Sequence, residues 1–72
     1  MSTDKEEEEM KTLKDAALFA TNIKEANAAV NALEAYGNRA LPHLQYLVDS
    51  ATDENVRQSA MQSIRRIKQG LI

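Results

Sequence analysis

The sequence has no cysteine and no tryptophan, and its 72 residues include one phenylalanine, one histidine, one proline and two glycines. Without cysteine there is no disulfide framework, no thiolate nucleophile and no thiolate metal site. The single histidine, His43, has no second histidine or carboxylate pair at ligand spacing, so we expect it on the surface. No glycine-rich phosphate loop or metal motif occurs. We therefore expect neither an enzyme nor a cofactor or metal site.

Long apolar runs are also missing. None approaches the ~20 residues that span a bilayer. The N-terminal residues lack the apolar core and the small-residue cleavage site of a secretory signal peptide. We expect a cytoplasmic protein with no membrane partner.

Charge is unevenly distributed along the chain, whose formal net charge is −2. Residues 1–15 carry three lysines against six acidic residues, a local −3, whereas residues 53–72 carry four basic against two acidic residues, a local +2. The run of glutamates at 6–9 is expected to be a solvated first turn of a helix. Few basic residues, no interleaved aromatics and an acidic balance argue against a nucleic-acid partner.

What the chain does have is helical periodicity. Apolar residues recur at spacings of three and four, which is typical of helices that bury one face. The pattern predicts an all-α single domain, residues 1–72, with four helices at about 4–20, 23–36, 40–51 and 53–69 and with residues 1–5 frayed. The predicted buried stripes contain Met10, Leu13, Ala16, Ala17 and Ala20; Ile23, Ala26, Ala29, Val30, Leu33 and Tyr36; Leu41, Leu44, Leu47, Val48 and Ala51; and Val56, Ala60, Ile64 and Ile67.

Helix-terminating residues agree with these boundaries. Thr3 with Glu6, and likewise Asn22 with Glu25, have capping-box spacing at the starts of the first two helices. Gly37 is typical of a left-handed C-terminal cap. Pro42 fits the first turn of the third helix, where a missing N–H costs nothing.

The two halves of the chain align when the sequence is shifted by 31 residues. The shift places Met10 on Leu41 and Leu33 on Ile64, and it superposes the break at residues 21–22 on the break at residues 52–53. A shared break and shared apolar positions in one register indicate two tandem helical hairpins, about 7–37 and 38–69. We expect them to form a short α-solenoid.

The second unit resembles a known family. The stretch from Gly37 to Leu44, Gly-Asn-Arg-Ala-Leu-Pro-His-Leu, is similar to the first-helix signature of HEAT repeats, and the stretch from Asp53 to Ala60, Asp-Glu-Asn-Val-Arg-Gln-Ser-Ala, is similar to the second. The short period resembles the HEAT-like repeats of the phycobilisome-lyase type. Residues 7–37 match less well and lack both the proline and the arginine.

The resemblance implies a right-handed α-solenoid fragment and a scaffold role, in which second helices line a surface that holds another protein. It also implies that Asp53 caps its helix and that Arg57 supports the stack. Family members usually contain many repeats in tandem, and each repeat of a solenoid needs a neighbour on both sides to bury its apolar surface. Two repeats alone therefore leave both ends uncovered.

Two groups of residues are candidates for partner binding. Arg57, Met61, Arg65 and Lys68 share one face of the fourth helix, which could take an acidic partner, although helix dipoles alone favour such cations. Leu18 and Phe19 lie outside the first helix's stripe and form either an exposed patch or part of the core.

The residues leave several functions open. We expect a protein-protein interaction module that docks a partner on the second helices, at residues 23–36 and 53–69. The main alternative is structural self-assembly, as a homodimer or by head-to-tail stacking of open repeat ends. Weaker alternatives are an accessory subunit for an enzyme, by analogy with the phycobilin-attaching relatives, and a weak nucleic-acid binder.

Overall fold

The computed structural model describes the fold of residues 2–70 and the side chains of residues 5–70. This part of the chain is all-helical, with four α-helices and one short 3₁₀-helix: α1 (Ser2–Leu18), α2 (Ile23–Glu34), η1 (Gly37–Ala40), α3 (Leu41–Ser50) and α4 (Glu54–Lys68). The all-α prediction is confirmed, and the predicted helix ranges are close to those observed. The capping box expected at Thr3 and Glu6 requires a side chain outside the described residues.

The observed helix boundaries have local physical causes. The side chain of Asn22 caps α2 by accepting a hydrogen bond from the Glu25 amide at 2.9 Å, while Glu25 accepts from the Thr21 amide and hydroxyl. Asp53 caps α4 by accepting from the Asn55 amide at 2.8 Å. These side chains satisfy backbone donors that a helix start leaves without partners.

Three predicted boundaries differ from the structure. α1 begins at Ser2 rather than near residue 4, and it ends at Leu18 rather than near residue 20. α2 ends at Glu34 rather than near residue 36. Gly37 has the left-handed conformation expected of it, at φ +67°, and is also the first residue of η1. That left-handed conformation strains any residue with a Cβ, which is why glycine occupies the position. Pro42 lies in the first turn of α3, as predicted.

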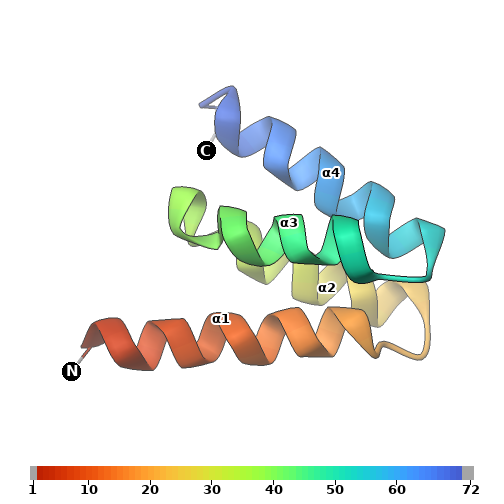
Figure 1. Cartoon of the computed structure of the whole chain (residues 1–72), viewed down its shortest axis with the longest axis horizontal. Helices are drawn as coiled ribbons and strands as arrows, with labels where there is room; N and C mark the ends of the chain where they lie inside the picture. The colour runs from red at the N-terminus through yellow and green to blue at the C-terminus, as the bar shows by residue number, and fades with distance from the viewer. Residues whose placement is uncertain (1, 71–72) are drawn as a thin grey trace.

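The helices form two hairpins that lie against each other. α1 packs on α2 and α3 on α4, while between the hairpins α1 packs on α3 and α2 on α4. Figure 1 shows both short turns, α1–α2 and α3–α4, at one end of the molecule and both termini at the other. α4 diverges from α3 toward its C-terminal end in that view.

One apolar core runs through both hairpins. Every residue of the predicted stripes is buried in this core or packs against it except Ala16, which is exposed, and Ile23, which is half-exposed. The partly buried ones are Leu13, Ala20, Tyr36, Leu41, Val48 and Ile64. Met10, Leu33, Leu44 and Leu47 are fully buried. Each such side chain contributes about 1.5–3 kcal/mol by leaving water.

Candidate partner-binding surface

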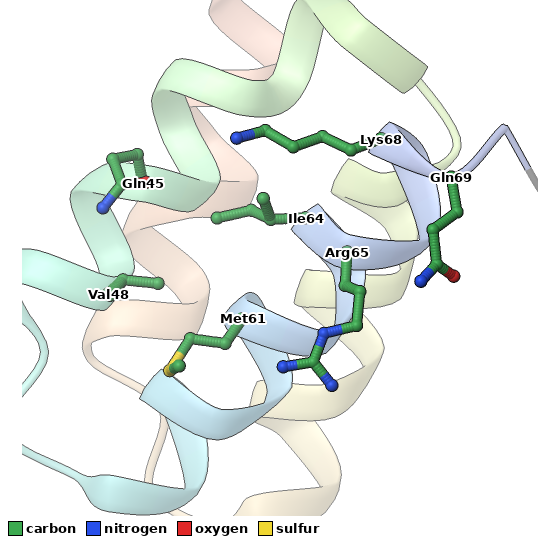
Figure 2. Close-up of a pocket in the computed structure, with 7 residues that line it drawn as sticks. All are labelled: Gln45, Val48, Met61, Ile64, Arg65, Lys68 and Gln69. Carbon is green, nitrogen blue, oxygen red and sulfur yellow. The ribbon is translucent and has the colours of Figure 1, made fainter.

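A groove of about 460 Å³ lies between α3 and α4 on the side of the second hairpin that faces away from the first. Figure 2 shows Met61 and Ile64 projecting from α4 toward Val48 of α3, with the Lys68 side chain extending across the groove above Ile64. The complete lining consists of Gln45, Val48, Met61, Ile64, Arg65, Lys68 and Gln69. The spacing of the α4 residues, at three and four, places them along one side of the helix.

The floor of this groove is apolar and its rim is cationic. Met61 leaves 41% of its surface exposed, whereas Val48 and Ile64 are partly buried against the core. Within the described residues, no ion pair joins Arg65 or Lys68 to a carboxylate. The lining contains no acidic residue. A flexible, exposed methionine beside unpaired cations suits a surface that packs on apolar groups and attracts carboxylates.

Arg57 belongs to a different environment from the other three residues predicted with it. Its Nη1 donates to the Ala51 carbonyl at 3.2 Å, and its Nη2 forms an ion pair with Glu54. Arg57 thereby ties α4 to the turn that precedes it. Hydrogen bonds from Gln58 and Arg57 hold the pKa of Glu54 below its usual value. Arg57 does not line the groove, so the structure brings together only Met61, Arg65 and Lys68 of the predicted set.

The second predicted patch is divided by the structure. Leu18 packs against the core, whereas Phe19, the next residue, is 75% exposed just beyond the end of α1. Adjacent residues on a helix point about 100° apart, and the end of α1 turns Leu18 toward the core and Phe19 away from it. Of the two alternatives, burial against the core fits Leu18 and exposure fits Phe19; Ile23, four residues further along the chain, is 49% exposed.

Sequence reasoning missed a polar clamp between α2 and α4. Glu34 accepts from the Ser63 hydroxyl at 2.7 Å and from Arg66 at 2.8 Å (Nε) and 2.7 Å (Nη2). Further along the same pair of helices, the Ser59 hydroxyl donates to Asn27 at 2.5 Å. The Glu34 side chain is only 12% exposed. The paired guanidinium and the Ser63 hydroxyl hold its pKa below the usual value, although burial acts in the opposite direction.

The clamp determines what the α2–α4 face offers to a partner. Shallow hollows on that face are lined by amide, hydroxyl, carboxylate and guanidinium groups, with Ala35 the one apolar residue; the polar residues are Asn27, Asn31, Glu34, Ser59, Gln62 and Arg66. Arg66 is engaged within the molecule, so it is a less available cation than Arg65. Of the surfaces between α4 and its neighbours, the α3 side therefore carries the exposed apolar group and the unpaired charges.

The glutamates at 6–9 are largely exposed, as expected, and three of them also bond residues outside α1. Glu6 pairs with Arg39 at 2.5 Å, Glu7 bonds His43 Nε2 at 2.7 Å, and Glu9 accepts from the Tyr36 hydroxyl at 2.6 Å. The His43 side chain is 11% exposed, so this histidine is more buried than expected, although its partner Glu7 is exposed. The Glu9 carboxylate raises the pKa of Tyr36, because ionising the phenol would lose that hydrogen bond and set two negative charges together.

Other kinds of site have no support in the part of the chain that the structure describes. Among the side chains described, those of residues 5–70, no three histidine or acidic groups gather in a way that could hold a metal ion. None of the helices formed there has the length and apolar character needed to cross a membrane. Comparison of the chain with protein-family models, with curated proteins and with solved structures finds no match.

Proposed function

We propose that the two hairpins are consecutive HEAT-like repeats of a short right-handed α-solenoid. The order of packing supports this arrangement, because first helix lies on first helix and second on second, whereas α2 and α3 touch only slightly. The cap at Asp53 and the bond from Arg57 to the Ala51 carbonyl agree with the structural roles that the resemblance implies for these residues. The absence of cysteine fits the proposed cytoplasmic setting.

On this arrangement, the chain functions as a polypeptide-binding module. The observation that carries the proposal is the α3–α4 groove, where Met61 stays exposed beside two cations that have no acidic neighbour in the lining. In a solenoid, this is the side on which a further repeat would pack. Binding through α4 fits the expected second-helix docking, but it uses the α3 side of α4 rather than the α2–α4 face.

The groove's chemistry defines the ligand class. An apolar floor flanked by Arg65 and Lys68 suits a helix that presents aliphatic side chains between carboxylates. Interfaces of this kind gain most of their energy from a few central contacts, and we expect Met61 to be one of them. Arg65 and Lys68 would chiefly set orientation and association rate, because charges at an exposed rim are partly screened.

A photo-crosslinking amino acid placed at Gln45 tests the module directly. In cell extract, a probe on the groove rim should form covalent adducts with polypeptides, and a probe at Asn31, on the α2–α4 face, should form far fewer. Met61→Asp should reduce the adducts at position 45 at least several-fold. Gln62→Asp adds the same charge at the adjacent exposed position of α4, so it serves as the matched control and should leave them unchanged.

Two results would overturn the proposal. Equal adduct yields from positions 45 and 31 would mean that the groove has no preference for polypeptide. If Met61→Asp leaves the adducts at position 45 unchanged, the crosslinked polypeptides do not bind in the groove. Helical circular dichroism of each variant, compared with the unsubstituted chain, separates lost binding from lost folding.

A further inference from the structure

The contact between the two hairpins shows how one hairpin covers the next. On the first hairpin, Glu34 and Asn27 reach across to α4, and Val30, which is 1% exposed, lies on the same side of α2 at spacings of three and four. The 31-residue shift maps these three positions onto the second hairpin as Arg65, Gln58 and Met61. Met61 and Arg65 line the open groove. The groove is therefore the second hairpin's version of a surface that, in the first hairpin, is covered by a hairpin.

The first hairpin has the complementary uncovered side. A hollow of about 450 Å³ on the outer side of α1 and α2 is lined by Lys5, Glu8, Glu9, Thr12, Leu13 and Tyr36, and an adjoining one by Leu13, Ala32, Ala35 and Tyr36. The same shift maps Ala32 and Ala35 onto Ser63 and Arg66, the residues of α4 that receive Glu34. This outer side thus corresponds to the face with which the second hairpin docks on the first.

We propose that the occupant of the α3–α4 groove is a second copy of this chain, which docks the outer side of its α1–α2 hairpin there. This inference rests on the proposed function and names the partner. The docking repeats the hairpin-on-hairpin packing inside each copy, with the flexible Met61 against the alanines of α2. Alanines at 32 and 35 leave room for the larger methionine, which replaces Val30 of the internal contact.

Charge selects this head-to-tail arrangement over symmetric pairing. Two α3–α4 grooves placed face to face would oppose Arg65 and Lys68 with their own copies, and like charges so placed cost energy. Head-to-tail docking instead sets that cationic rim against the outer side of α1 and α2, whose hollow contains two carboxylates, Glu8 and Glu9, and one cation, Lys5. The contact is heterologous, so it leaves a free groove on one end copy and builds open chains of copies.

Two variants test the proposal, and each blocks one of the two docking surfaces. Met61→Asp with Arg65→Glu blocks the groove and leaves the α1–α2 side intact. Glu8→Arg with Ala35→Arg blocks the α1–α2 side and leaves the groove intact, and both positions are exposed, so folding should be preserved. Sedimentation velocity should show each variant as a monomer on its own and the equimolar mixture as a discrete 1:1 dimer. The unsubstituted chain should form concentration-dependent chains that weaken as salt screens the charges.

The alternatives give different results. A mixture that remains monomeric at the concentrations where the unsubstituted chain is tested would overturn the inference, and so would a dimer formed by the Glu8→Arg, Ala35→Arg variant alone, since that dimer would be symmetric. The control variant carries Gln62→Asp alone, with the groove residues unchanged, and it should still form chains of copies. If sedimentation shows no self-association while position 45 still crosslinks to other polypeptides, the proposed function stands and only the partner named here is wrong.

Discussion

Glu34 of α2 and Arg66 of α4 form a two-pronged ion pair, with the guanidinium Nε at 2.8 Å and Nη2 at 2.7 Å from the two carboxylate oxygens. The buried Ser63 hydroxyl donates to the same carboxylate. Glu34 and Arg66 are 32 residues apart in sequence and belong to different hairpins. The pair therefore links the first hairpin to the second rather than stabilising either one alone. Parallel donors from one guanidinium fix geometry as well as adding energy.

The first prediction concerns the stability that this pair provides. Arg66→Ala should lower the free energy of unfolding by about 1–2 kcal/mol, because it removes two charge-assisted hydrogen bonds and leaves a mostly buried carboxylate with only Ser63. Arg65→Ala removes the neighbouring arginine, which has no ion pair in the described structure, and should change stability by less than about 0.5 kcal/mol. Urea unfolding at low protein concentration measures both. Equal losses from the two substitutions would contradict the assignment.

The second prediction is a pH dependence that Glu34 causes. Its pKa in the folded chain lies below the usual 4.5, so the ionised carboxylate stabilises the fold above that pH. This contribution should disappear as the pH falls through the depressed folded value, because protonation then proceeds in the folded state too. Glu34→Gln should therefore be less stable than the unsubstituted chain at neutral pH, and the gap should narrow on acidification. A gap that stays constant with pH would contradict the depressed pKa.

The third prediction concerns the attachment of α1 to Tyr36, in the turn between α2 and η1. Glu9 raises the pKa of Tyr36 above its usual 10.0. In a Tyr46→Phe background, where Tyr36 is the sole tyrosine, Glu9→Gln should lower the midpoint of phenolate absorbance toward the usual value. Glu8→Gln removes an adjacent carboxylate that does not bond Tyr36 and should shift the midpoint less. If both substitutions shift it equally, the effect is general charge rather than the hydrogen bond at 2.6 Å.

The sequence predicted the elements that depend on local chemistry. Helix positions followed from apolar spacing, and the caps at Asn22 and Asp53 followed from short side chains at the ends of those stripes. Hydropathy could not distinguish Leu18 from Phe19, since both are apolar and only the helical rotation at the end of α1 decides which is covered. Likewise, the run of glutamates predicted exposure but not the bonds to Arg39, His43 and Tyr36, because these partners lie about 30 residues away.

The candidate site was predicted only in part, because spacing along one helix does not show which residues of other helices lie beside it. Spacing placed Met61, Arg65 and Lys68 on one side of α4, and the structure adds the α3 residues that complete the groove. Spacing also grouped Arg57 with them, but Arg57 donates a hydrogen bond to the Ala51 carbonyl and does not line the groove. The clamp at Glu34 had one signal in the sequence: a serine and an arginine, three residues apart, at 63 and 66. Its partner was hidden because contacts between repeats follow no short spacing.

The methionine methyl groups allow the most direct test of the groove. Met61 lies in it and Met10 is fully buried, so ¹³C-methyl labelling gives a probe and an internal reference in one molecule. The labelled Glu8→Arg, Ala35→Arg variant, whose groove is intact, is titrated with unlabelled Met61→Asp, Arg65→Glu variant. We predict a saturable shift of the Met61 methyl resonance while the Met10 methyl stays in place. A Met61 resonance that does not move across the titration would contradict the docking of one copy in the groove of another.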